Sequence, residues 1–302
     1  MCGLFGFSKY GTNHISNLST LTNALANEAS VRGTDATGID TCNKGVINII
    51  KEAKPAYKMD FKHSDNISAL IGHTRHSTQG SEKRNYNNHP FIGKTDSSTF
   101  ALAHNGVLLN DMELRKKLCL PKTKIETDSY IAVQLIESKK DLNFDTLKYM
   151  AETIEGSFSF SVLDDKNDIY LVKGDSPLTI LHFPDDKIYV YASTENILYK
   201  ALVDSPLFNS LKKGSFEEIP INEGDILKLS SDGEIETEKF KYTVSYGRSW
   251  CDYGYYGGFT EDEDYLDLLK AAATFEGHNP EIVDYLIENG FTYDEVEEYI
   301  YS

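Results

Sequence analysis

The chain has 302 residues, 40% of them hydrophobic, and a formal net charge of −17 at pH 7, which is typical of a globular protein. Non-specific nucleic-acid binding requires a surplus of Lys and Arg, so the acidic balance argues against it. No apolar run is long enough to cross a bilayer, and the N-terminus lacks a signal-peptide pattern. We therefore expect a cytoplasmic protein without a membrane segment. The four cysteines are far apart, with no C-x-x-C pair, so we expect neither a metal site nor a disulfide framework.

The first half of the chain predicts short strands and helices. Strands are expected at 3–9, 46–50, 69–73 and 100–104, and helices at 15–30, 110–119 and 128–138. The β-branched run at 46–50 predicts a buried strand. Asp128 opens the last helix, since an acidic residue suits the positive end of the helix dipole.

The second half predicts hairpins. Residues 158–164 and 169–173 are joined by Asp-Lys-Asn-Asp, and residues 225–229 and 234–238 flank Ser-Ser-Asp-Gly. A further strand is expected at 188–193, followed by a short helix from about Glu195. Runs of strands mixed with helices, rather than strict alternation, predict an α+β fold with stacked sheets.

The C-terminal segment differs in charge from the rest of the chain. From Ser245 to Ser302 there are fourteen acidic and two basic residues, a formal charge of −12. We expect a main domain at 2–242, a Tyr- and Gly-rich linker at 243–260 and an acidic helical extension at 261–302.

Two helices are predicted in this extension. In the first, Asn279 is expected at the N-cap, Pro280 at the first helical position and Gly290 just after the end. In the second, Thr292 with Glu295 matches a capping box at the start. Their apolar residues are Ile282, Val283, Leu286, Val296 and Ile300. A small cap on the main domain and a module that docks a partner both fit this pattern.

Cys2 is the first residue that could carry chemistry. It becomes N-terminal if Met1 is removed, which the small Cys2-Gly3 pair permits. The free α-amine would have a pKa of about 7.7–8.0, so it could act as general base for its own side chain. Taken alone, however, a cysteine near a terminus is more often a small apolar residue.

Four polar clusters elsewhere in the chain also contain residues that could take part in catalysis. They are VRGTDATGI at 31–39, GHTRHSTQG at 72–80, NNHPF at 87–91 and AHNGVLLND at 103–111. We interpret the first as a polar turn. In the second and fourth, a strand ends in Arg75 and in Asn105-Gly106.

These residues suit hydrolysis of an amide on an amino acid. Arg75 can bind an α-carboxylate through two parallel hydrogen bonds, and Asp128 can neutralise an α-ammonium. Asn105 and the Gly106 N–H can form an oxyanion hole, in which one donor is worth ~2.7–4 kcal/mol. Each residue also has an ordinary explanation: an ion pair for Arg75, a hairpin turn for Asn105-Gly106 and a helix cap for Asp128. All of them together, beside an N-terminal Cys, favour catalysis.

With these segments in order, the chain resembles the class II glutamine amidotransferase domain, an N-terminal-nucleophile hydrolase. It is similar above all to the glutaminase domains of glucosamine-6-phosphate synthase and amidophosphoribosyltransferase. The matching segments are MCGLFG, VRGTDATGI, GHTRHSTQG, NNHPF, LAHNGVLLND and ETDSY, with weaker matches at 154–164, 174–178, 192–198 and 221–229. The resemblance spans about residues 2–240. It implies a four-layer αββα sandwich of two stacked antiparallel sheets.

The resemblance also implies roles. Cys2 would be the nucleophile with its α-amine as base, and Asn105 and Gly106 would stabilise the oxyanion. The implied substrate-binding residues are Arg75, Thr78, Asp128, Arg32 and His89. Residues 75–80 match a mobile loop that closes over L-glutamine. No cofactor and no metal are implied.

Two positions depart from the relatives. His76 follows Arg75 where the named relatives have Trp or Tyr, so it is either a plain loop residue or changes how the loop closes. The sequence Arg32-Gly33-Thr34-Asp35 differs from the R-G-P-D of the asparagine-synthetase branch.

The relatives pass ammonia to an attached domain, but only about sixty residues follow the matched region here, too few for a sugar isomerase or phosphoribosyltransferase. No ATP-binding or dinucleotide-binding motif is present in the sequence. We expect a glutamyl thioester, glutamate, and ammonia that is used by a synthetase on a separate chain or simply released. Two alternatives stay open: an N-terminal-nucleophile hydrolase of another amide, and a non-catalytic scaffold that reuses the fold.

Overall fold

The computed structural model describes residues 2–242, 266, 269–270, 273, 278–289 and 291–300. The chain divides into two compact units, Met1–Val244 and Ser245–Ser302, and each is described by itself. The linker predicted at 243–260 lies outside the described residues. Within the described ranges, no helix combines the length and the apolar character needed to cross a bilayer.

Two antiparallel sheets form the middle of the first unit. The strands of one sheet are β1 (Gly3–Lys9), β2 (Ala36–Asn43), β3 (Val46–Glu52), β4 (Ala69–Arg75), β9 (Thr179–Phe183), β10 (Ile188–Ala192) and β11 (Glu217–Glu218). Those of the other are β5 (Phe91–Lys94), β6 (Thr99–Leu108), β7 (Gly156–Asp164), β8 (Ile169–Lys173), β12 (Asp225–Leu229) and β13 (Ile235–Lys239). Their orders are β11-β9-β10-β1-β4-β2-β3 and β13-β12-β8-β7-β6-β5. The predicted hairpins β7–β8 and β12–β13 are both confirmed.

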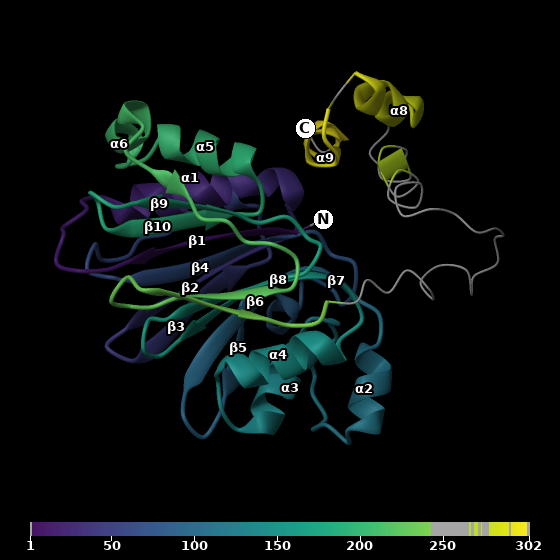
Figure 1. Cartoon of the computed structure of the whole chain (residues 1–302). Helices are drawn as coiled ribbons and strands as arrows, with labels where there is room; N and C mark the ends of the chain where they lie inside the picture. The colour runs from purple at the N-terminus through teal and green to yellow at the C-terminus, as the bar shows by residue number, and fades with distance from the viewer. Residues whose placement is uncertain are drawn as a thin grey trace. The chain divides into compact units, whose positions relative to one another are not determined.

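Helices cover the two outer faces of this sandwich (Figure 1). On the side of β1 lie α1 (Leu18–Ala29), α5 (Glu195–Val203) and α6 (Phe208–Lys213), and on the other side lie α2 (Asp111–Lys117), α3 (Tyr130–Lys139) and α4 (Phe144–Thr153). The layers therefore run helix, sheet, sheet, helix, and the predicted α+β fold of four layers is confirmed.

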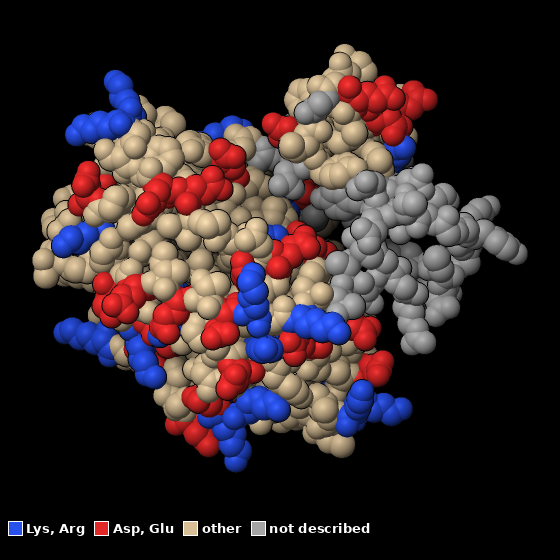
Figure 2. All heavy atoms as spheres, in the orientation of Figure 1, with Lys and Arg blue, Asp and Glu red and all other residues tan. Residues whose placement is uncertain are grey.

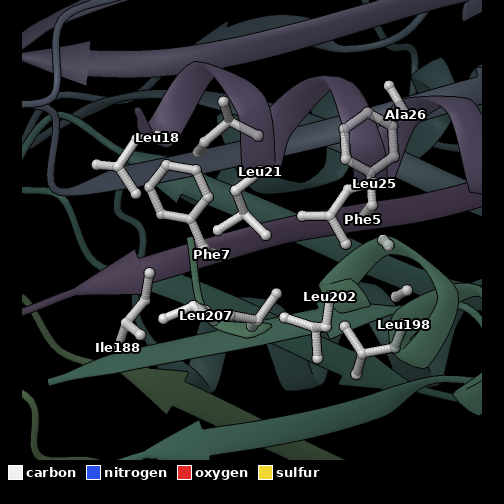
Figure 3. Packing of buried hydrophobic residues seen from close by; sticks show 14 of the residues in the cluster. Phe5, Phe7, Leu18, Leu21, Leu25, Ala26, Ile188, Leu198, Leu202 and Leu207 are labelled. Carbon is white, nitrogen blue, oxygen red and sulfur yellow. The ribbon is translucent and has the colours of Figure 1, made fainter. Parts of the chain in front are cut away.

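β1 is buried along its whole length because it is a central strand covered on both faces. Phe5 and Phe7 point to the outer helical layer, where they pack with Leu18, Leu21 and Leu25 of α1 (Figure 3). Burying each such side chain stabilises the fold by about 1.5–3 kcal/mol. Leu4, on the opposite face, belongs to the core between the sheets. The strand that follows Cys2 is thus held firmly on both sides.

Two expectations for this sheet are wrong. The strand at 46–50 is not buried: β3 is an edge strand, its residues alternate in exposure, and Val46 is 65% exposed. The segment 31–39 is only partly a turn, because Ala36 begins β2, which lies between β3 and β4 and is buried up to Cys42. Whether a strand lies at the edge or the centre depends on distant partners, which local patterns do not contain.

The described part of the second unit contains α8 (Glu281–Glu288) and α9 (Tyr293–Ile300). Its small core includes all five predicted apolar residues. The capping box is confirmed: Thr292 N donates to Glu295 Oε2 over 2.8 Å, and Glu295 N donates to Thr292 Oγ1 over 3.4 Å. Pro280 occupies the N-cap rather than the first helical position, with no cap hydrogen bond from its own side chain. Asn279 Oδ1, one residue earlier, accepts from Glu281 N over 3.1 Å.

Gly290, the predicted end of the first tail helix, lies outside the described residues. Acidic side chains gather over α8 on the face shown in Figure 2. Their sign agrees with the charge difference between the two parts of the sequence.

Candidate active site

The pairing of β1 with β4 brings the first candidate residues together. Gly3 lies opposite Thr74, so Cys2, just before β1, comes next to Arg75 at the end of β4. Both line a narrow pocket of about 10 Å³, room for about one water molecule. The other lining residues are His76, Thr78, Gln79, His89, His104, Gly106, Thr127, Asp128 and Ser129.

The Cys2 thiol is partly buried and contacts the loop that follows β4. His76 N donates to the sulfur over 3.4 Å, and the thiol donates to His76 O over 3.5 Å. Burial raises the pKa of the thiol, and the His76 amide and Arg75 oppose this shift. The resting side chain is therefore a thiol and needs a base before it can attack.

Arg32 supports Cys2 from outside the pocket. It ends the short 3-10 helix Ser30–Arg32 and is 3% exposed. Its Nε donates to the carbonyl oxygen of Cys2 over 2.9 Å, which fixes the backbone of the residue that carries the thiol. Arg32 is not among the residues that line the pocket.

The guanidinium of Arg75 holds the loop at 76–80 in place. Nη2 donates to the carbonyl oxygens of Gln79 and Gly80, each over 2.7 Å, and Nη1 donates to Asn88 Oδ1 over 2.7 Å. At the start of the loop, Ser77 N donates to Asp35 Oδ2 over 2.7 Å. Arg75 is thus bound to its own loop, with one nitrogen shared by two backbone carbonyls.

Asp128 faces the pocket and does not cap α3. Its Oδ2 accepts from Leu108 N over 2.7 Å, and its Oδ1 accepts from Ser129 Oγ over 3.3 Å. The N-cap of α3 is Ser129, and its side chain makes no cap hydrogen bond. The helix-cap explanation of Asp128 is therefore wrong: the carboxylate is bound to the end of β6 instead.

Asn105 and Gly106 lie inside β6, so the hairpin-turn explanation is also wrong. Gly106 has φ +133, and a Cβ there would lie 2.0 Å from Ser157 O, so only glycine fits. Asn105 is 1% exposed, and its Nδ2 has no hydrogen-bond partner among the described residues. Gly106 lines the pocket and Asn105 adjoins it in sequence.

The sequence is similar to those of glutamine amidotransferases, and the fold is similar to that of one solved member. Residues 73–200 match the family model described as a glutamine amidotransferase domain. Glutamine--fructose-6-phosphate aminotransferase [isomerizing] of Clostridium acetobutylicum is 31% identical over 206 residues, 66% of this chain and 32% of the relative. The Francisella tularensis enzyme of the same name is 26% identical over 269 residues, 81% of this chain and 40% of that enzyme. The fold is similar to that of glutamine phosphoribosylpyrophosphate amidotransferase from B. subtilis, with a TM-score of 0.62 and 20% identity over 90% of this chain and 58% of that one.

The chain contains a class II glutamine amidotransferase domain. The chain spans 32% and 40% of the length of these two curated relatives. Of the eight candidate residues predicted from the sequence, six line the pocket of the amidotransferase domain: Cys2, Arg75, Thr78, His89, Gly106 and Asp128. Arg32 and Asn105 are buried next to members of this set.

The amidotransferase domain also contains a buried histidine cluster, of which sequence reasoning identified only His89. The ring centroids of His73 and His89 are 4.1 Å apart, and those of His89 and His104 are 6.4 Å apart. Burial lowers the pKa of all three, that of His73 to about 3, so the rings are neutral. His73 Nε2 donates to the carbonyl oxygen of His104 over 2.9 Å. The signal was present, since each of the last three polar clusters contains one of these histidines.

Proposed function

We propose that the domain hydrolyses L-glutamine through the Cys2 thiol and supplies ammonia to a synthetase on a separate chain. One observation carries the proposal: the Cys2 thiol, the Arg75 guanidinium and the Asp128 carboxylate line the same pocket. These are the groups needed to attack a side-chain amide while an α-carboxylate and an α-ammonium are held. We assign the reaction to residues 2–242, with residues 261–302 as an extension.

The chemistry begins once Met1 is removed. The α-amine of Cys2 takes the thiol proton, and the sulfur attacks the amide carbon of glutamine. The tetrahedral intermediate collapses as the α-ammonium returns the proton to the leaving nitrogen, which departs as ammonia. Water, deprotonated by the same amine, then attacks the glutamyl thioester and releases glutamate and the thiol. The raised pKa of the buried thiol supports the need for a base at this position.

Asn105 is suited to stabilise the oxyanion together with the N–H of Gly106. A buried donor without a partner costs about 1–3 kcal/mol, and the cost is relieved when an oxygen binds it. Asn105 Nδ2 is such a donor. Since charge on the oxygen develops only in the tetrahedral intermediate, this interaction favours the transition state over the substrate.

Glutamine binding requires the loop at 76–80 to move, because the pocket has room for only about one water molecule. We propose that Arg75 exchanges the carbonyl oxygens of Gln79 and Gly80 for the α-carboxylate of glutamine. Thr78 and His89 line the same space, and Asp128 receives the α-ammonium. Arg32 contributes indirectly by holding the backbone of Cys2.

We place the reaction in the cytoplasm, because a catalytic thiol is best preserved in a reducing compartment.

The test is glutamate release from glutamine by protein whose intact mass shows that Met1 has been removed. Acid quenching during turnover should trap the glutamyl thioester on the Cys2 peptide. Absence of glutamate with cleavage of another amide would favour a different substrate, and retention of Met1 in active protein would overturn the proposed base. Copurification of the tagged native chain, with and without residues 261–302, tests for the separate synthetase.

A further inference from the structure

Lys51 in β3 reaches from an edge strand to the backbone beside the pocket. Its Nζ donates to the carbonyl oxygen of Asn88 over 2.5 Å and to that of Pro90 over 2.8 Å. The same ammonium lies 5.1 Å from the centroid of the Phe91 ring. One side chain therefore contacts the segment 88–91 at three residues, one before His89 and two after it.

This segment carries two side chains of the site. Asn88 Oδ1 accepts from Arg75 Nη1 over 2.7 Å, and the ring of His89 lines the pocket. Asn88 Nδ2 donates to Glu82 O over 2.8 Å, which fixes the orientation of the amide. The segment also presses against β2, where a Cβ at Gly38 would come within 2.2 Å of His89 O.

The position of Lys51 is unfavourable for a lysine. Among the described residues, no carboxylate forms an ion pair with it. The titratable groups that interact electrostatically with Lys51 are Arg75, His73 and His89, and none of them carries a negative charge. Burial, and secondly Arg75, lower the pKa of Lys51 to about 8. An apolar residue of similar length would avoid this cost, which points to a role for the two hydrogen bonds.

We propose that Lys51 is a positioning residue for glutamine binding. By fixing the Asn88 and Pro90 carbonyls, its ammonium sets the Asn88 side chain against the Arg75 guanidinium and keeps His89 at the pocket. The inference rests on the proposed function. It assigns Lys51 to the binding of the α-carboxylate and not to the chemistry at Cys2.

The test compares Lys51→Met, which keeps the length of the side chain, with Lys54→Met. Lys54 is a matched control on the same segment, 53% exposed and paired with Glu52. Lys51→Met should raise KM for glutamine about tenfold, the loss expected for one weakened charge-assisted hydrogen bond, with kcat within about twofold. The control should match the wild type. Thermal unfolding of both variants verifies that they are folded.

A second readout separates this inference from the proposed function. Iodoacetamide should alkylate Cys2, followed on the N-terminal peptide, at the same rate in Lys51→Met and the wild type, while protection by glutamine should need about tenfold more glutamine. If the wild type hydrolyses glutamine and Lys51→Met has an unchanged KM, the positioning role is wrong and the proposed function stands. If the wild type neither hydrolyses glutamine nor is protected by it, both are wrong.

A double-mutant cycle tests the route through Asn88. If Lys51 acts by holding Asn88, then Lys51→Met combined with Asn88→Ala should raise KM little more than the larger single effect. Effects that multiply would show that the two residues act independently, and would overturn the proposed route.

Discussion

The backbone N–H of His76 donates to the sulfur of Cys2 over 3.4 Å, while the thiol lies 3.5 Å from the carbonyl oxygen of the same residue. The residue after Arg75 therefore contacts the proposed nucleophile through its backbone. Because Arg75 binds the far end of the loop at Gln79 and Gly80, thiol and guanidinium are joined by one short segment. A movement that frees Arg75 also changes the surroundings of the thiol.

The first prediction concerns this loop. Arg75→Lys keeps the charge but lacks the planar guanidinium. A lysine cannot make all the hydrogen bonds of Arg75 to the loop carbonyls and Asn88, and it cannot bind the α-carboxylate of glutamine through two parallel hydrogen bonds. We expect KM for glutamine to rise by about 10²-fold and amide hydrogen exchange in residues 76–80 to become faster without substrate. Steady-state kinetics and exchange mass spectrometry check the two parts. Unchanged exchange in the variant would show that Arg75 does not hold the loop closed.

The second prediction concerns the nucleophile. Cys2→Ala should lower glutamate release at least about 10³-fold, because alanine cannot form the thioester intermediate. Cys2→Ser should retain only weak activity. Cys119→Ala is the control, since Cys119 is an exposed thiol outside the pocket. Activity of Cys2→Ala near that of the control would contradict the mechanism.

The third prediction separates the oxyanion donor from the binding residues. Asn105→Ala should reduce kcat by about 10²–10³-fold, equivalent to ~2.7–4 kcal/mol, with a small change in KM. The variant should lose little stability, because the removed Nδ2 has no hydrogen-bond partner among the described residues. Kinetics and thermal unfolding together decide: a marked loss of stability with unchanged kcat would assign Asn105 a structural role.

The fourth prediction is a pH effect on stability. Asp40 is fully buried in β2, neither carboxylate oxygen has a hydrogen-bond partner, and burial raises its pKa from 3.8 to about 8. The backbone amides of Asn48 and Thr41 oppose this shift but do not outweigh the effect of burial. Because the folded state holds this proton more tightly, Asp40 should lower the free energy of unfolding as pH rises from about 4 to about 8.

Asp40→Asn removes this titration. We expect the variant to gain about 1–3 kcal/mol of stability relative to the wild type at pH 9, and much less at pH 5. Urea unfolding at both pH values measures the difference, with the exposed Asp60→Asn as control. An equal change at the two pH values would mean that Asp40 is not protonated in the folded protein.

Sequence reasoning located most of the pocket because the polar clusters adjoin short apolar runs, which are recognisable from the local sequence. Arg75 follows a recognisable apolar run, and the pair Asn105-Gly106 directly follows another. The hairpins β7–β8 and β12–β13 could also be predicted, since turn residues mark their connections.

The features that could not be predicted from the sequence depend on contacts between residues far apart in the chain. The exposure of β3 and the burial of Asp40 follow from which strands flank β2, and the contact between the rings of His73 and His89 follows from how the two sheets meet. α4 was missed although Asn143 caps it, with Thr146 N donating to Asn143 Oδ1 over 2.9 Å. The Asn cap was present in the sequence but is a weak signal without a long apolar stripe.

The position of β1 between β4 and β10 has a consequence for synthesis of the protein. Phe5 pairs with Gly72 on one side and with Ala192 on the other, so the first strand acquires its second neighbour only after most of the first unit has left the ribosome. During that interval the N-terminus is accessible for the removal of Met1 that the proposed mechanism requires. A nascent or truncated chain that ends before β10 would carry an N-terminal cysteine without an assembled site. The catalytic reactivity that we propose for Cys2 would thus appear late in synthesis, when β1 has a neighbouring strand on both sides.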